Sequence, residues 1–216
     1  MDNSVEAYIY VAQYHTCLES DKYRISQVIN TTSFDNNIAS FEDITLAPNY
    51  SLTGELGANF LTIWLPMVGG LIFKNKSADD LFIDAGQAFL IIGNSSYEIV
   101  NPYATELVNF LQIQVAVSNK IVSQELVRFN LVHKNQLLSM SNACLPIYIG
   151  KFDGREESIY QPHNQQSSIF AFVITGAFEV QNRLLEPRDG LLLKNLTTAV
   201  EFEALSNEAI ILFLEV

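Results

Sequence analysis

The strongest constraint on the fold of this chain is an internal repeat, in which the end of the second half echoes the end of the first. Residues 81–115 run through a glycine turn, an apolar strand, a short strand and a long apolar strand, and residues 187–216 return to this order. One constant shift places Gly86 on Asp189, Phe110 on Phe213 and Gln112 on Glu215. The repeat predicts two similar domains, and each half of the 216-residue chain is long enough to form its own core.

Short apolar segments follow one another at intervals of about ten residues, and clusters of Gly, Pro, Asn and Asp separate them. This spacing predicts an all-β sandwich or barrel rather than alternating strands and helices. Residues 7–14 fit either a first strand or a short helix. The expected strands cover residues 23–29, 38–46, 59–66, 71–75, 81–84, 88–92, 97–100, 107–117, 147–152, 156–161, 169–174, 177–180, 183–185, 191–193, 199–202 and 209–216.

The repeated glycine turns favour a duplicated barrel of the cupin type, a double-stranded β-helix or jelly roll, with little helix. We expect residues 1–118 to form the N-terminal barrel and residues 147–216 the C-terminal barrel. Residues 119–146 mix polar and apolar side chains with little β-branching. We therefore interpret them as an inter-domain connection that contains irregular segments or a short helix.

Composition argues against two classes of partner. The formal net charge is −12 and no three Lys or Arg residues follow one another, so a phosphate backbone would be repelled and direct nucleic-acid binding is not expected. The most apolar run, residues 60–73, is shorter than the ~20 residues of a membrane-spanning helix and contains Pro66, so no membrane segment is expected. Cys17 and Cys144 are far apart in the sequence, which indicates reduced thiols in a cytoplasmic protein.

Several local strings carry a family resemblance. They are FEDITLAP at residues 41–48, LTIWL at 61–65, GQA at 86–88, the apolar strand 107–115, and residues 184–190 with the closing strand 210–216. In these strings the sequence resembles the pirin-like bicupins, whose members include enzymes with quercetinase activity. The resemblance covers nearly the whole chain and implies two tandem cupin barrels. It also implies an iron ion in the N-terminal barrel, held by a His-Pro-His pair and a later His-x-Glu.

The iron ligands of that family are missing from this sequence. The resemblance places the first ligand pair at Thr53 and Glu55 and the second pair at Ile99 and Asn101. A shift of one residue would instead bring Glu98 into the second pair. Of the four aligned positions, Glu55 alone is a competent ligand, and one carboxylate cannot replace three imidazoles and a carboxylate. We therefore expect a metal-free barrel with no cofactor and no catalytic residue.

The pocket candidates are the former metal positions and their neighbours: Thr53, Glu55, Trp64, Tyr97, Glu98, Ile99 and Asn101. Because Trp64 is large and the polar ligands have been replaced, we expect side chains to fill this interior. If a small pocket remains, Glu55 and Asn101 are its expected polar anchors. His163 has no second His or Cys near it in the sequence, so we interpret it as solvated surface.

The sequence thus predicts a pirin-like bicupin that has lost its iron ligands and acts as a non-catalytic cytoplasmic binding or regulatory protein. The expected partner is a small-molecule ligand or another protein, and the sequence indicates no oligomeric state. The alternative function is that of a quercetinase-like dioxygenase with an atypical metal site around Glu55 and Glu98.

Overall fold

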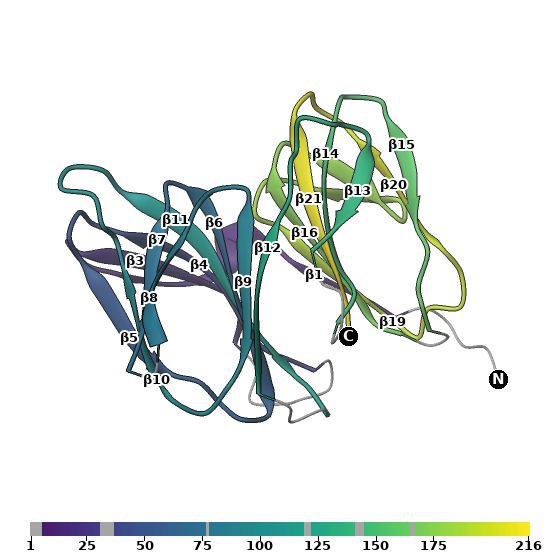
Figure 1. The fold of residues 1–216 in the computed structure, drawn as a ribbon. Coiled ribbons are helices and arrows are strands. Elements are labelled where there is room, and N and C mark those ends of the chain that lie inside the picture. Colours follow the sequence, from purple (N-terminus) through teal and green to yellow (C-terminus); the bar gives the residue numbers. More distant parts are fainter. Residues whose placement is uncertain (1–5, 31–36, 77, 119–121, 141–144, 165–166) are drawn as a thin grey trace. The chain divides into compact units, whose positions relative to one another are not determined.

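The computed structural model describes residues 6–30, 37–76, 78–118, 122–140, 145–164 and 167–216. It confirms the all-β fold, because every regular element of these residues is a strand except one 3-10 turn, η1 (Ala12–Tyr14) (Figure 1). The strands are β1 (Glu6–Tyr10), β2 (Thr16–Glu19), β3 (Tyr23–Asn30), β4 (Ile38–Leu46), β5 (Ser51–Glu55), β6 (Phe60–Val68), β7 (Leu71–Asn75), β8 (Ala78–Ile83), β9 (Gln87–Ile92), β10 (Ser96–Val100), β11 (Val108–Ala116), β12 (Ser123–Arg128), β13 (Gln136–Ser139), β14 (Ile147–Phe152), β15 (Glu157–Tyr160), β16 (Ile169–Thr175), β17 (Phe178–Val180), β18 (Arg183–Leu185), β19 (Gly190–Lys194), β20 (Val200–Ala204) and β21 (Ala209–Glu215).

The chain forms two compact units. The first barrel is the unit Thr16–Phe129, and the second barrel is the unit made of residues 1–15 and 130–216. The first barrel has a seven-stranded sheet in the order β12-β9-β6-β11-β4-β3-β2 and a four-stranded sheet β5-β10-β7-β8. The second barrel has a six-stranded sheet in the order β1-β19-β16-β21-β14-β13 and a four-stranded sheet β15-β20-β17-β18.

The two strand orders are the same, which confirms the internal repeat. In particular β6, β9 and β11 of the first barrel correspond to β16, β19 and β21 of the second. The central strands β6 and β16 are apolar and buried along most of their length, as expected for strands paired on both edges and covered on both faces. Alternate side chains of the surrounding strands build a separate apolar core within each barrel.

The expected domain boundaries require a correction at both barrels. Strand β1, at the start of the chain, pairs with β19 and belongs to the second barrel rather than to the first. Residues 119–146 hold no helix among their described positions. Instead they supply β12, which pairs with β9 of the first barrel, and β13, which pairs with β14 of the second. Each of β1 and β12 covers the edge of a buried strand whose backbone groups would otherwise lack partners.

These strands escaped the sequence analysis for a physical reason. An edge strand is half exposed and needs no continuous apolar pattern, so β12 mixes exposed and half-buried residues and β2 is exposed at every position. The open question at residues 7–14 resolves into both alternatives in part. A strand, β1, is followed by the single 3-10 turn η1.

Asp189 holds the segment after β1 against the turn before β19. Its side chain is buried, with 6% exposed. Its Oδ1 accepts a hydrogen bond of 2.8 Å from the Ala12 N–H, and its Oδ2 accepts one of 2.9 Å from the Glu186 N–H. The carboxylate therefore satisfies two backbone donors from distant parts of the chain, which a neutral side chain of the same size cannot do.

We expect Asp189→Asn to lower the free energy of unfolding by about 1–3 kcal/mol, because the new amide NH₂ would face a backbone donor that is left without an acceptor. Urea denaturation measures the change. Asp79→Asn, at an exposed aspartate, is the matched control and should change stability little. Equal stability of Asp189→Asn and the wild type would contradict this role.

Candidate functional site

An aromatic cluster occupies the interior of the first barrel. We define it as Trp64, Phe73, Phe89 and Tyr97, which all belong to the buried core of this unit. The ring centroids of Trp64 lie 5.2 Å from those of Phe73 and 4.9 Å from those of Tyr97, and the Phe73 and Phe89 rings are 4.9 Å apart. At these distances the rings are in direct contact, so side chains fill this part of the barrel.

Gln112 connects the aromatic cluster to the polar side of the interior. Its Oε1 accepts hydrogen bonds from the Trp64 indole N–H at 2.8 Å and from the Tyr97 hydroxyl at 3.3 Å. This orients its Nε2 toward Oε2 of Glu42, at 3.5 Å. Gln112 lies directly opposite Trp64 on β6 and opposite Glu42 on β4, so the register of the sheet fixes the contacts.

The row continues to Gln27 on β3, which lies opposite Glu42 and donates a hydrogen bond of 3.5 Å to its Oε1. We call Gln27, Glu42, Gln112 and Trp64 the polar row. Burial raises the pKa of Glu42, and the bond from Gln27 opposes this effect. Burial, together with the nearby Glu42 charge, raises the pKa of Tyr97 to about 12, so its phenol keeps its proton and stays a donor.

The predicted pocket residues do not meet at one point. Tyr97 lies opposite Gly54, and Glu98 lies opposite Thr53. Because side chains alternate along a strand, Tyr97 and Ile99 point into the core while Thr53, Glu55 and Glu98 lie on the outer face of the four-stranded sheet. The sequence alignment could not reveal this division, since a shift of one residue moves a side chain to the other face.

Asn101 has a structural role that fully occupies its amide. It is completely buried. Its Nδ2 lies within hydrogen-bond distance of the carbonyl oxygens of Leu46 (3.1 Å), Ala47 (2.9 Å) and Glu106 (2.8 Å), and its Oδ1 accepts a bond from the Tyr103 N–H (3.0 Å). Asn101 thereby joins the ends of β4, β10 and β11, and it is not available as a ligand anchor.

The residues at the family's iron positions do not fit an iron ion. On the inner face between β5 and β10, a Cβ atom at Gly54 would lie 2.5 Å from the Tyr97 ring, so the ring takes up the space there. Within the described ranges, no three His, Cys, Asp or Glu side chains come together as metal ligands. A metal shell needs several converging donors, and this interior offers mainly indole, phenol and amide groups.

Four of the seven pocket candidates nevertheless line a cavity of about 640 Å³ on the outer face of the four-stranded sheet. Its lining residues are Thr53, Gly54, Glu55, Lys74, Asn75, Lys76, Ser96, Tyr97 and Glu98. Glu98 accepts a hydrogen bond of 2.6 Å from the Ser51 hydroxyl, and Lys74 forms an ion pair of 3.7 Å with Asp80. The cavity is therefore a polar surface of mixed charge, separate from the aromatic cluster.

The second barrel carries a carboxylate at the position that Gln112 has in the first. Glu215 is 4% exposed. Its oxygens accept hydrogen bonds from the Tyr160 hydroxyl (2.9 Å), the Ser167 hydroxyl (2.6 Å), the backbone N–H groups of His163 (2.9 Å) and Asn164 (3.0 Å), and His163 Nδ1 (3.0 Å). Burial raises the pKa of Glu215, but these bonds outweigh burial and lower it to about 2.

His163 is not simply solvated surface, which corrects the sequence interpretation. Its side chain is 48% exposed, yet Nδ1 is bound to Glu215 and Nε2 lies 3.2 Å from the Tyr148 hydroxyl. Its ring stacks on Tyr148. Burial and the hydrogen bond to Glu215 strongly raise the pKa of Tyr160, so this phenol stays protonated as a donor. The signal in the sequence was the pair Gln112 and Glu215, polar residues at equivalent places in apolar strands.

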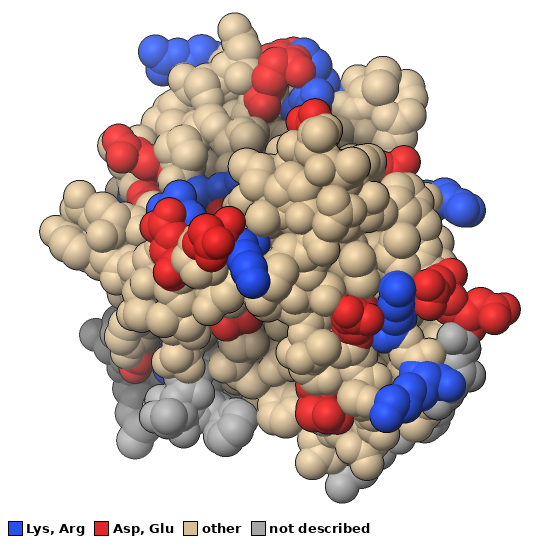
Figure 2. Space-filling model, turned by 90° about the vertical axis from the view of Figure 1, so that its left-hand side faces the viewer, with Lys and Arg blue, Asp and Glu red and all other residues tan. Residues whose placement is uncertain are grey.

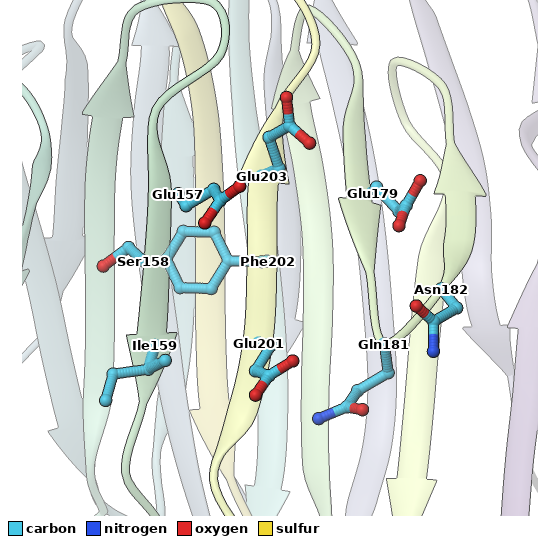
Figure 3. Close-up of a pocket in the computed structure, with 9 residues that line it drawn as sticks. All are labelled: Glu157, Ser158, Ile159, Glu179, Gln181, Asn182, Glu201, Phe202 and Glu203. Atoms are coloured by element: carbon cyan, nitrogen blue, oxygen red, sulfur yellow. The ribbon is translucent and has the colours of Figure 1, made fainter.

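A second cavity, of about 550 Å³, lies on the outer face of the four-stranded sheet of the second barrel. Figure 3 shows Glu157, Glu203 and Glu179 on three neighbouring strands, with Glu201 further along β20. Arg155 forms an ion pair of 3.6 Å with Glu203. The lining is strongly acidic and solvated.

Charges are mixed on the face of the molecule in Figure 2. Acidic and basic side chains lie next to one another there in small groups, and the described residues of this face form no continuous basic area. Such a face lacks the clustered Lys and Arg side chains that bind a phosphate backbone. The described residues also include no helix that is long and apolar enough to span a membrane.

Comparison with known proteins places this geometry in a family. Residues 142–216 match the family described as "Quercetinase C-terminal cupin domain". The crystal structure of YhhW from Escherichia coli covers 98% of this chain and 97% of its own, with a TM-score of 0.82 at 13% identity. The chain is a pirin-like bicupin. No curated protein sequence matches this pirin-like bicupin.

Other solved structures share the fold of this pirin-like bicupin. Bacterial pirin YhhW from Escherichia coli in complex with nickel(II) has a TM-score of 0.81 at 14% identity and covers 97% of this chain and 98% of its own. Quercetin 2,3-dioxygenase from Acinetobacter baumannii has a TM-score of 0.76 at 11% identity and covers 98% of this chain and 78% of its own. At such low identity these likenesses establish the fold and leave the chemistry to the residues described above.

We expect Glu215→Gln to lower the free energy of unfolding at neutral pH by about 3 kcal/mol, since a pKa of about 2 in place of 4.5 corresponds to that stabilisation. The pKa is depressed in the fold, so the stabilisation is present above pH 4.5 and is lost as the pH falls toward 2. Urea unfolding of both proteins across this range measures the difference, which should shrink with acid. A difference that is independent of pH would contradict the assignment.

The aromatic cluster predicts a graded response at Tyr97. Tyr97→Phe keeps the ring and loses the bond to Gln112, at a cost of about 1 kcal/mol, whereas Tyr97→Ala leaves a cavity and should cost about 3–5 kcal/mol. Thermal or urea unfolding measures both. Tyr14→Ala, at a tyrosine with 78% of its surface exposed, is the control and should have little effect. A mild effect of Tyr97→Ala would show that this ring does not fill the interior.

Proposed function

We propose that this pirin-like bicupin is a non-catalytic cytoplasmic protein that works without a metal and acts by binding a ligand or a partner protein. The observation that carries the proposal is the interior of the first barrel. The aromatic cluster and Gln112 take up the inner face where the family's resemblance would place iron. The acidic composition and the separated cysteines support the cytoplasm as its compartment; Cys17 is exposed and free, and Cys144 lies outside the described residues.

The chemistry of the donors supports the absence of a metal site. Indole N–H groups and protonated phenols do not coordinate iron, and burial keeps the Tyr97 phenol protonated at neutral pH. Thr53 and Glu55 point to the outer face, so they cannot converge with Ile99 and Asn101 on one ion. In the second barrel, Glu215 already accepts bonds from the Tyr160, His163, Asn164 and Ser167 donors and has no capacity left for a cation.

One observation favours the alternative of a quercetinase-like dioxygenase with an atypical metal site. Glu55 and Glu98 both line the outer cavity of about 640 Å³. Two features weigh against it. Glu98 is already bonded to Ser51, and the lining residues of this cavity include no imidazole or thiol to complete a metal shell. We therefore favour the binding function.

The proposal predicts that the purified protein retains no stoichiometric metal. After incubation with Fe²⁺ or Ni²⁺ and exhaustive dialysis, elemental analysis should find the same trace content as for a metal-free control protein. The physical reason is that no converging set of imidazoles or carboxylates exists in either barrel among the described residues. Stoichiometric iron or nickel after dialysis would overturn the proposal.

The Glu55→Ala and Glu98→Ala variants separate the two functions. If the protein is non-catalytic, oxygen consumption with flavonol substrates stays at the background rate in the wild type and in both variants. Oxygen consumption by the wild type that is abolished in Glu55→Ala would instead establish the dioxygenase. The double-shift of a cofactor to the second barrel is tested by Glu215→Gln in the same assay.

A further inference from the structure

One polar side chain in the first barrel is buried without a partner. Thr62 has no exposed surface, and its Oγ1 forms no hydrogen bond with any described residue. It lies two residues before Trp64 on β6 and therefore on the same, inner face. A buried hydroxyl without a partner costs free energy, so its presence calls for an occupant that supplies a hydrogen bond.

The neighbours of Thr62 are also weakly bonded. Gln114 lies opposite Thr62 on one side and opposite Ser40 on the other. The hydrogen bond from Ser40 to Gln114 is 3.5 Å long, and both bonds to Glu42, from Gln27 and from Gln112, are also 3.5 Å long. Bonds of this length are at the outer limit for N–H···O and O–H···O contacts and contribute little.

The second barrel shows what full satisfaction looks like at the equivalent place. Glu215, which corresponds to Gln112, accepts bonds of 2.6–3.1 Å from the segment that follows β15. In the first barrel, the segment that follows β5 places the apolar side chain of Leu56 in the core instead. The carboxylate there, Glu42, has no ion pair with a described Lys or Arg. Acceptors on this inner face therefore outnumber strong donors.

We infer that Glu42, Gln114 and Thr62 form a binding site for a small organic cation with several N–H donors, of the guanidinium or primary ammonium class. The carboxylate supplies the charge, and the amide and hydroxyl oxygens accept the remaining N–H groups. This inference deepens the proposed binding function and rests on it, since a metal in the same interior would compete for Glu42. Burial raises the pKa of Glu42, and a bound cation would offset that cost.

The chain offers its own probe for this site. Trp64 is the single tryptophan, and its indole N–H is bonded to Gln112, the neighbour of Glu42 in the polar row. Any ligand at Glu42 that moves Gln112 changes the surroundings of this indole. Intrinsic fluorescence of the full-length protein therefore reports on the site directly.

The experiment titrates the wild type with methylguanidinium and ethylammonium at millimolar concentrations. Tetramethylammonium is the matched control, because it carries the same charge without any N–H donor. We expect a saturable change of Trp64 emission with the first two and none with the third. Thermal stability should rise in parallel for the two donors, which gives a second readout on the unaltered protein. A response shared by tetramethylammonium, or no saturable response at all, would overturn the inference.

Two variants and one control locate the site. Glu42→Gln should raise the dissociation constant for methylguanidinium by about tenfold or more, and Thr62→Val by a smaller factor, because the charged bond is the stronger one. Glu106→Gln, at an exposed carboxylate of the same barrel, should leave it unchanged. Wild-type affinity of Glu42→Gln would overturn the inference. If Glu42→Gln fails to fold, Thr62→Val and the cation series on the wild type decide.

The outcomes also separate this inference from the proposed function. A metal-free protein with a silent fluorescence series keeps the proposed function and removes the cation site, leaving ordered water as the occupant of the row. Stoichiometric metal after dialysis overturns the proposed function, whatever the fluorescence series gives.

Discussion

The interior of each barrel depends on one polar residue on the inner face of its last long strand. In the first barrel, Gln112 accepts bonds from Trp64 and Tyr97 and so fixes two large rings of the aromatic cluster. In the second, Glu215 gathers five side-chain and backbone groups around one carboxylate. An amide can bridge donors and an acceptor, whereas a carboxylate can only accept. This single difference explains why one interior holds aromatic rings and a second polar residue while the other holds a turn of backbone.

Most of the fold could be predicted from the sequence, because buried strands such as β6 and β16 carry an apolar pattern that the repeat doubles. The edge strands β1, β2, β12 and β13 could not be assigned to their barrels, since pairing partners far along the chain leave no local pattern. The filling of the first barrel was expected from Trp64. The faces of Thr53, Glu55 and Glu98 were not, because an alignment cannot resolve an alternation of period two.

The polar network shows a different limit of sequence reasoning. Glu42, Gln27 and Gln112 are unremarkable in the sequence and become neighbours through the register of β3, β4 and β11. His163 looks isolated because its partner, Glu215, lies some fifty residues away along the chain. What the sequence did contain was the coincidence of Gln112 and Glu215 under the repeat. A polar residue at matching places in two apolar strands indicates a conserved geometric role within one molecule, which no single strand reveals.

The place of β1 has a consequence for synthesis of the protein. Its backbone partner, β19, leaves the ribosome nearly a whole chain later, and so does Asp189, which receives the Ala12 N–H. The first barrel lacks no strand when β12 emerges, so it can fold while β1 still waits without a partner. The earliest strand to be translated is thus among the last to be paired, and until then its tyrosines are open to chaperones and to neighbouring chains.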